Sequence, residues 1–294
     1  MASCGIRRCF HLHSSRHRFG QTFGERSIVT KEQIDTYQED GVICLRQIFE
    51  SKWLLMLWKG YEKVCQSSDR IIERKTDGHG NFYLGADAQA QTQPIEEYLE
   101  FIKHSPAAEV AGRLMKSSLA AFIKDSTVHH KAICPTYETA WHQDQVFQPC
   151  DGPYNCSVWI PLTPVGKHLK FIRKSHLVGL IPKMDANEDN YDEVEHPGLL
   201  EVVNSTSEEN IVAYELEPGD CIVFNTRTIH TVDYSFLGER LNVITRWAAD
   251  DAAMVKWPWK VYPPQEDAYP SDLKLGDKWW KSKHTLVPWK DIDY

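Results

Sequence analysis

The feature that most constrains this chain is a pair of possible metal ligands two residues apart, joined much later by a third. The pair is His142 and Asp144 in the stretch Trp141-His142-Gln143-Asp144, and the third residue is His230. On a strand, both side chains of the pair point to the same face. Two imidazoles and one carboxylate on one face of a metal leave the other positions open, which is the usual ligand set of non-haem Fe(II) oxygenases. The pattern therefore predicts an iron site built from two separate segments.

The surroundings of these residues strengthen the prediction, because a His-x-Asp pattern alone arises by chance. A turn expected at 135–139 precedes Trp141, and the turn at 217–220 (Glu-Pro-Gly-Asp) leads into an apolar strand before His230. Arg240 follows soon after His230, where its guanidinium can pair with the carboxylate of a cosubstrate. This spacing is typical of a 2-oxoglutarate-dependent dioxygenase.

From about Ile28 to the C-terminus the chain resembles the phytanoyl-CoA dioxygenase family. The similar parts are residues 29–43, Lys131 with the W-H-x-D of residues 141–144, residues 166–176, the G-D…H block within residues 217–230, and residues 240–251. The resemblance implies a mostly β fold, the double-stranded β-helix (a jelly-roll or cupin-like barrel). It also implies Fe(II), 2-oxoglutarate and O2 as reaction partners, and a Lys131 that points towards the cosubstrate.

The chain departs from the family pattern in residues 166–174 and at one expected contact to the cosubstrate. Gly166-Lys167-His168 and Arg173-Lys174 stand where the family has Asn-Gly-Cys and Pro-Gly. Val232 stands where the family often has a hydroxyl residue that contacts 2-oxoglutarate. Because members act on fatty acyl-CoA, ectoine, phosphonates and secondary metabolites, the resemblance implies the reaction type more closely than the substrate.

The first 27 residues differ in composition from the rest. They contain five arginines, several serines and histidines, and a single acid, Glu25. An arginine-rich, acid-poor start without an apolar run is typical of a mitochondrial transit peptide. The alternative is an untargeted tail on a cytoplasmic protein. Residues 28–294 are predicted to form one catalytic domain.

Composition argues against several classes of function. The chain has a net charge of −8 although its first 27 residues are basic, so its body is acidic. Nucleic-acid binding requires a basic surface, and we expect no such partner. We also expect no membrane span, because no apolar run reaches the length of about 18 residues that a span requires. The eight cysteines show no regular spacing, which favours free thiols over a disulfide framework or a zinc site.

Sequence patterns predict helices first and strands afterwards. Thr30 and Gln33 form a capping-box pattern, so a helix is expected over 31–39 and should stop at Gly41. Further helices are expected after Ser51 as a cap, over 95–102 and over 107–119, and a polar surface insertion is expected at 185–195 and again at 204–210. Short strands separated by Gly, Pro and Asp fill the rest, an order that fits a jelly-roll barrel with flanking N-terminal helices.

Alternation along the strand expected after His230 assigns its two faces. Arg240, Asn242 and Arg246 share one face, and a polar inner face suits a barrel that holds a ligand. Arg240 and Arg246 lie about 20 Å apart along a strand, so they cannot grip the same carboxylate. Arg240 is predicted to anchor 2-oxoglutarate by a forked ion pair. Arg246 is predicted to pair with Asp250 or Asp251 in a structural role.

Three other residues are candidates for the cosubstrate pocket. Lys131 points either into the barrel or to solvent, and His129 lies on the same strand face with the same two interpretations. His130 points the other way and is expected to be solvated. Trp159 shares its face with Ser157 and is expected either to wall the iron site or to be a core residue.

A basic cluster in the otherwise acidic body predicts the kind of substrate. Its members are Lys167, His168, Lys170, Arg173, Lys174 and His176. A charged run is usually a solvated face. The cluster stands where the family pattern has glycine and proline, close to the expected barrel mouth. This position favours binding of an anionic substrate group.

The leading hypothesis is an Fe(II)- and 2-oxoglutarate-dependent dioxygenase that hydroxylates a small, anionic metabolite, with ascorbate as reductant. The expected metal ligands are His142, Asp144 and His230, and the expected cosubstrate residues are Arg240, Lys131, Trp159 and His129. The presence of Asp144 disfavours halogenation. The alternatives are a non-catalytic metal-binding or interaction module on the same barrel, an acyl-CoA hydroxylase, and a cupin-type metal enzyme without 2-oxoglutarate.

Overall fold

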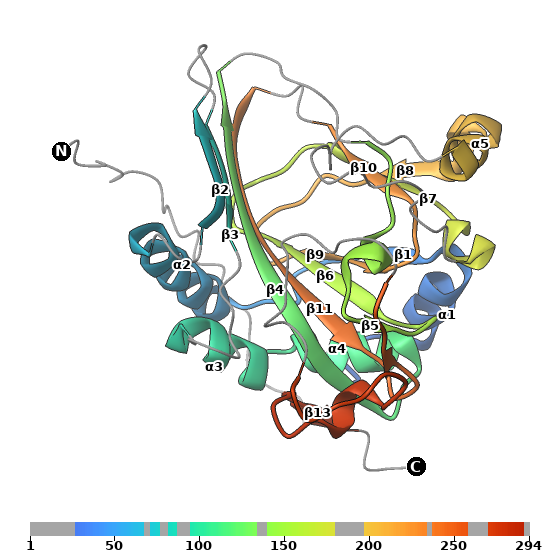
Figure 1. Ribbon diagram of the computed structural model, residues 1–294. Helices are drawn as coiled ribbons and strands as arrows, with labels where there is room; N and C mark the ends of the chain where they lie inside the picture. Colours follow the sequence, from blue (N-terminus) through green and yellow to red (C-terminus); the bar gives the residue numbers. More distant parts are fainter. Residues whose placement is uncertain are drawn as a thin grey trace, which may run out of the picture.

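The structure is a computed structural model of the chain, and it describes residues 27–67, 71–76, 82–86, 95–133, 140–179, 197–233, 237–257 and 270–290. Long antiparallel strands run through the middle of the molecule, and helices lie on both sides of them in this view (Figure 1). The prediction of a mostly β fold with N-terminal helices is confirmed. The predicted leader, the turn at 135–139 and the insertion at 185–195 lie outside the described residues, apart from Ser27 at the end of the leader.

The first helix forms as its capping pattern predicts. α1 (Lys31–Asp40) begins after Thr30, whose hydroxyl accepts a hydrogen bond from the Gln33 backbone N–H at 3.2 Å. The Gln33 side chain accepts in return from the Thr30 backbone N–H at 2.8 Å, so both halves of the capping box are present. The helix ends at Gly41, which has a left-handed φ of +74° and packs closely against His176. A side chain at position 41 would be strained and would also clash.

The next three helices agree with the predictions except at their ends. α2 (Ser51–Gln66) has Glu50 as its N-cap, without a capping side chain, so the prediction that Ser51 caps this helix was wrong. α3 (Glu96–His104) agrees with the sequence periodicity. α4 (Ala107–Met115) is shorter than expected, because Lys116 turns the chain with a left-handed φ of 52° and Leu119 already begins a strand.

Most of the described strands form one large antiparallel sheet. Its order is β1 (Val42–Leu45), β9 (Cys221–Asn225), β6 (Cys156–Pro161), β11 (Gly238–Ala248), β4 (Leu119–Ala132), β3 (Phe82–Ala86) and β2 (Ile71–Thr76), with β13 (Trp289–Lys290) on the lower part of β4. A second sheet consists of β10 (His230–Val232), β7 (Leu169–Ile172) and β8 (Ile211–Ala213), and β5 (Cys150–Asp151) pairs with β12 (Ala253–Met254). The described strands do not close into a continuous hydrogen-bonded ring.

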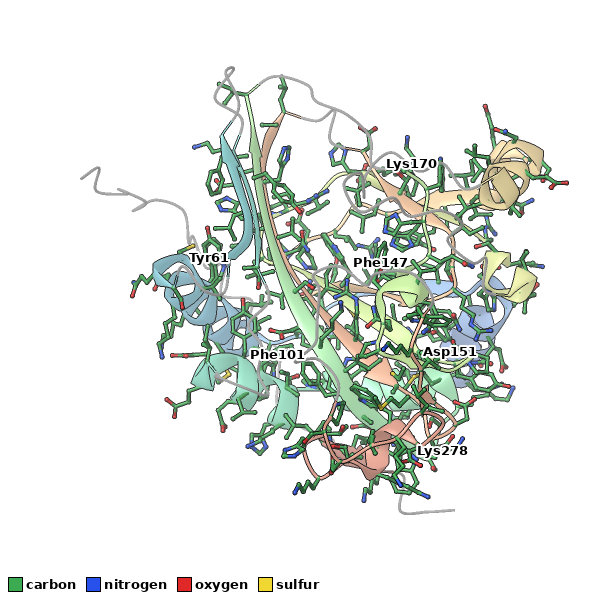
Figure 2. The ribbon with its side chains drawn as sticks, in the orientation of Figure 1. Tyr61, Phe101, Phe147, Asp151, Lys170 and Lys278 are labelled. Atoms are coloured by element: carbon green, nitrogen blue, oxygen red, sulfur yellow. The ribbon has the colours of Figure 1, made fainter. Side chains whose placement is uncertain are left out.

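The two faces of the large sheet have different neighbours. On one face, Leu241 and Val243 of β11 pack in one apolar core with Phe101 of α3. On the other face, Phe224 of β9 meets Phe171 of the small sheet with ring centroids 5.1 Å apart, so the two sheets face each other. Figure 2 shows Phe101 on the helical side of β4 and Phe147 on the opposite side. We call the face towards the small sheet the inner face, and the site described below lies there.

The second polar stretch, five of the cysteines and the lengths of the helices are also described by the structure. Part of the second polar stretch is helical: α5 (Pro197–Ser205) precedes a short 3-10 turn at Glu208–Asn210. Five cysteines of the described part are free thiols, as predicted. Among the described helices, none is long and apolar enough to cross a membrane.

Candidate metal centre

The backbone brings the two predicted histidine ligands opposite each other. His142 and His230 form an isolated antiparallel bridge, in which each backbone N–H donates to the carbonyl of the other at 3.0 Å. His230 begins β10 and lies opposite Phe171 of β7. Two segments far apart in the sequence therefore meet at this bridge, and the imidazole centroids are 4.2 Å apart.

Asp144 reaches the same site by a turn rather than by a continuous strand. Gln143 is extended (φ −114°, ψ 129°), so its two neighbours point to the same side. Asp144 then begins a 3-10 helix, Asp144–Phe147, which differs from the expected strand. The Gln143 side-chain amide donates to the carbonyls of Gly179 (2.9 Å) and Arg227 (2.6 Å), and these bonds hold the turn in place.

The three side chains present one ligand atom each to a common space. These atoms all lie within 4.8 Å of one another, and Asp144 Oδ1 is 3.9 Å from His142 Nε2 and 3.8 Å from His230 Nε2. The His142 Nδ1–H donates to the Ala140 carbonyl and the His230 Nδ1–H to the Thr228 carbonyl, both at 2.9 Å. Both Nε2 lone pairs consequently face the carboxylate. Such outer hydrogen bonds orient imidazoles that bind metal, so the residues fit a metal ion.

The second carboxylate oxygen of Asp144 is held by the protein. Asp144 is 5% exposed, and its Oδ2 accepts from Ser157 Oγ at 2.8 Å and from Arg246 Nε at 3.2 Å. Burial would raise the pKa of Asp144, but Arg246 and the two histidines outweigh it and hold the pKa well below its usual range. Burial lowers the pKa of His230 to about 3, and the nearby His142 adds to this, so the imidazole stays neutral. Neutral imidazole and ionised carboxylate are the forms that bind metal.

Arg246 has a different partner from the one predicted. The expected partners were Asp250 and Asp251, but the guanidinium donates to Asp144 and, from Nη1, to Ser126 Oγ at 2.9 Å. Alternation places Arg246 on the inner face, whereas the expected acids follow the end of β11. The prediction of the face was correct and the prediction of the partner was wrong.

Arg240 lies on the same inner face of β11, six residues from Arg246. Its side chain is 2% exposed, and the strand register places it opposite His130 of β4. It borders a cavity of about 140 Å³ whose other lining residues are Pro164, Val165, Gly166, His168, Leu237 and Glu239. The structure therefore puts a buried guanidinium on the wall of this cavity, on the face of β11 that also carries Arg246, the partner of Asp144.

Lys131 and His129 do not lie with the metal ligands. Lys131 is exposed, and His129 contacts Tyr61 Oη at 2.5 Å and Glu239 Oε1 at 2.8 Å on the helical side of the sheet. His130 is the inner residue: it is 4% exposed, contrary to the prediction that it is solvated. The alternation along β4 was correct, but the inner face had been assigned to the wrong set of residues. The pairing of His130 with Arg240 shows which face of β4 is the inner one. The sequence of a single strand does not show this pairing.

Trp159 lies on the inner face, as its shared face with Ser157 predicts. It is 4% exposed, packs in the apolar cluster that contains Ile222 and Phe224, and lies opposite Ile244 in the register. Ser157, two residues away, contacts Asp144 directly. Its position is compatible with both interpretations, a residue beside the iron site and a residue of the apolar core, since it is buried on the inner face.

The basic cluster does not form one continuous positive surface. Lys174 pairs with Glu39 at 2.8 Å, and Lys170 lies 3.7 Å from Asp233. Arg173 donates to a backbone carbonyl at 3.1 Å, and His168 borders the cavity beside Arg240. Different members of the cluster thus contact different elements.

The fold and the site together define a class. Between two facing antiparallel sheets lies a His-x-Asp…His cluster, with Asp144 and His230 buried, and this is the ligand set that non-haem iron oxygenases use. A family model described as Phytanoyl-CoA dioxygenase (PhyH) matches residues 37–232, which is more than half of the sequence. The chain belongs to the phytanoyl-CoA dioxygenase family, and it is an enzyme of the iron- and 2-oxoglutarate-dependent oxygenase class.

Several solved structures share this fold. SnoK, a "non-heme alpha ketoglutarate dependent carbocyclase" from nogalamycin biosynthesis, superposes with a TM-score of 0.65 at 20% identity, covering 90% of this chain and 99% of that one. The epimerase SnoN, solved with Fe3+, alpha ketoglutarate and nogalamycin RO, gives 0.65 at 18%, covering 88% and 98%. EctD from S. alaskensis, solved with 2-oxoglutarate and 5-hydroxyectoine, gives 0.57 at 18%, covering 80% and 81%. No curated protein sequence matches the chain.

Proposed function

We propose that this protein is an Fe(II)- and 2-oxoglutarate-dependent hydroxylase of a small, anionic metabolite. The observation that carries the proposal is the arrangement around Asp144. Its Oδ1 faces the Nε2 atoms of His142 and His230, while its Oδ2 is tied to Ser157 and Arg246. One carboxylate oxygen is thereby presented to a metal and the other is fixed. The relatives SnoN and EctD, whose structures were solved with iron, 2-oxoglutarate or both, support the same cofactors here.

Each residue of the site has a physical task in this proposal. When bound, the iron couples the oxidative decarboxylation of 2-oxoglutarate by O2 to hydroxylation of an aliphatic C–H bond. His142, Asp144 and His230 hold the metal. Arg240 anchors the distal carboxylate of 2-oxoglutarate by a forked ion pair. The rings of Phe171 and Phe224, centred 5.6 Å and 4.7 Å from the His230 ring, exclude water from that side of the site.

Release of succinate from labelled 2-oxoglutarate tests the proposal directly. The full chain, supplied with Fe(II), ascorbate and O2, is expected to release labelled succinate slowly even without a substrate. A screen of metabolite extracts for faster release would then identify the substrate. Iron binding without any succinate release would instead favour a non-catalytic module. Oxidation of an extract component that needs iron but no 2-oxoglutarate would favour a cupin-type enzyme.

Support for an anionic substrate comes from the basic residues between 167 and 176, of which His168 borders the cavity beside Arg240. Reversing the charges of Lys170, Arg173 and Lys174 is expected to raise the substrate KM at least tenfold, because nearby charges act within about 10 Å at ordinary salt. Slow decarboxylation without substrate should stay unchanged. Lys63→Glu is a matched control, since Lys63 is also paired with an acid, Glu97, but on helix α2.

Two outcomes would contradict this substrate class. An unchanged KM in the triple variant would leave the cluster as a solvated face. Fast turnover of a long-chain acyl-CoA would replace the small anionic substrate by the acyl-CoA alternative.

We further propose that residues 1–27 direct the protein to mitochondria. The support is their five arginines with a single acid, together with the start of the capped helix α1 only after Thr30. Deletion of residues 1–27 is expected to leave a soluble protein with wild-type succinate release. A fluorescent protein carrying these residues should enter mitochondria in cells, and its retention in the cytosol would reject the targeting role.

A further inference from the structure

The inner face of β11 carries a buried amide that the proposed function does not yet use. Asn242 is 1% exposed, and within the described part of the chain neither its Oδ1 nor its Nδ2 has a hydrogen-bond partner. Burying an amide without a partner costs free energy, and folded proteins rarely keep such a group. A residue of this kind calls for a partner that the described part of the chain does not supply.

The strand register shows where that partner must come from. The neighbours of Asn242 on the adjacent strands are Val128 of β4 and Pro161 of β6, whose side chains neither donate nor accept hydrogen bonds. The backbones of all three strands are engaged in the sheet ladders. The remaining direction is the space between the two sheets, where the candidate metal centre also lies.

Asn242 stands between the two arginines of the inner face. Arg240 is two residues away, about 7 Å along the strand. Arg246, four residues away in the other direction, is bonded to Asp144. A five-carbon diacid held by one end at Arg240, with its other end towards the metal ligands, would pass Asn242 close to the Arg240 end.

We propose that the Asn242 Nδ2 donates a hydrogen bond to the distal carboxylate of 2-oxoglutarate, beside Arg240. This inference depends on the proposed function, because it deepens the account of the same site. A neutral amide suits the position, since its Nδ2 can donate to a carboxylate without adding a charge beside Arg240. Asn242 is then a residue that determines the affinity and the selectivity for the cosubstrate.

Binding of 2-oxoglutarate to the Fe(II)-loaded, oxygen-free protein is the test, measured by calorimetry for the wild type and two variants. Asn242→Leu, of similar size, is expected to raise the Kd for 2-oxoglutarate at least tenfold. Asn242→Asp is expected to raise it further, because a second carboxylate repels the ligand. Affinity for Fe(II) should stay at the wild-type value in Asn242→Leu. The melting temperature of metal-free Asn242→Leu should equal or exceed that of the wild type, because the variant removes an amide that has no partner.

Asn225→Leu is the matched control for a buried asparagine with a purely structural role. Asn225 is 4% exposed, its Nδ2 donates to the Pro153 carbonyl at 2.7 Å, and its Oδ1 accepts from the Arg227 backbone N–H at 2.8 Å. Its replacement should lower the melting temperature and leave the Kd for 2-oxoglutarate unchanged.

The outcomes separate this inference from the proposed function. If the wild type binds 2-oxoglutarate and Asn242→Leu binds it equally well, the role of Asn242 is refuted while the proposed function stands. A fall in melting temperature of Asn242→Leu with an unchanged Kd would also refute it and make the residue structural. If the wild type binds Fe(II) but no 2-oxoglutarate, the proposed function itself fails and takes this inference with it.

Discussion

Replacing His142 by alanine is expected to abolish turnover and to weaken Fe(II) binding strongly. Loss of a residue that only hydrogen-bonds to a metal ligand weakens metal binding about 10–100-fold, and loss of a ligand itself should weaken it more. The fold should survive this change. The His142 side chain is 29% exposed, its Nδ1 donates to the nearby Ala140 carbonyl, and the buried Asp144 carboxylate keeps its bonds to Ser157 and Arg246 when His142 is removed. Metal-free His142→Ala should therefore melt within a few degrees of the wild type.

Asp144→Ala is expected to lose iron as well, but also to unfold at a lower temperature. Its removal leaves the buried Arg246 guanidinium without its carboxylate, which costs about 3–5 kcal/mol when a buried pair is broken from one side. The comparison of the two variants combines anaerobic Fe(II) titration with thermal unfolding of the metal-free proteins. An active Asp144→Ala variant would reject the metal ligand assignment, and a wild-type melting temperature for it would reject the ion pair.

Arg240→Ala is expected to raise the 2-oxoglutarate concentration for half-maximal succinate release by more than a hundredfold. The basis is the loss of one partner from a buried charged pair, about 3–5 kcal/mol, at about 1.4 kcal/mol for each factor of ten. Affinity for Fe(II) should change little, because Arg240 lies six residues along β11 from the arginine that contacts Asp144.

Arg246→Ala is expected to give the opposite pattern. Arg246 holds the Oδ2 of Asp144, so its loss should weaken Fe(II) binding about 10–100-fold and should lower the melting temperature. At saturating iron, the 2-oxoglutarate concentration for half-maximal succinate release should be closer to the wild-type value in Arg246→Ala than in Arg240→Ala. Equal effects of the two substitutions on the 2-oxoglutarate requirement would mean that Arg240 is not the cosubstrate anchor.

Local chemistry predicted the start of the fold well. The reciprocal bonds of Thr30 and Gln33 and the left-handed Gly41 depend on residues within one helix, so the sequence alone is sufficient to place α1. The end of α4 was less predictable. Ala107 to Met115 has helical periodicity, but the stop at Lys116 reflects the entry of the chain into β4, a tertiary requirement.

In the candidate site too, the sequence predicted some features and only the tertiary structure decided others. The spacing of His142 and Asp144 and the later His230 predicted three ligands on one metal, because the turns before these residues and Arg240 after them also match the expected context. The turn that carries Asp144 and the antiparallel bridge between the two histidines were not visible in the sequence. Both depend on hydrogen bonds between segments far apart in the chain.

By itself the sequence determined the class of site, the presence of α1 and the sets of residues that share a strand face. The tertiary structure alone decided which set faces the metal. A period of two separates Lys131 and His129 from His130, but it carries no information about which set is covered by helices and which by the second sheet. Pairing of β4 with β11 places His130 opposite Arg240, and it is this register that turns Lys131 and His129 away. Pairing of β11 with β6 places Arg246 opposite Ser157, and both side chains contact Asp144, so Arg246 does not pair with the acids that follow it in the sequence.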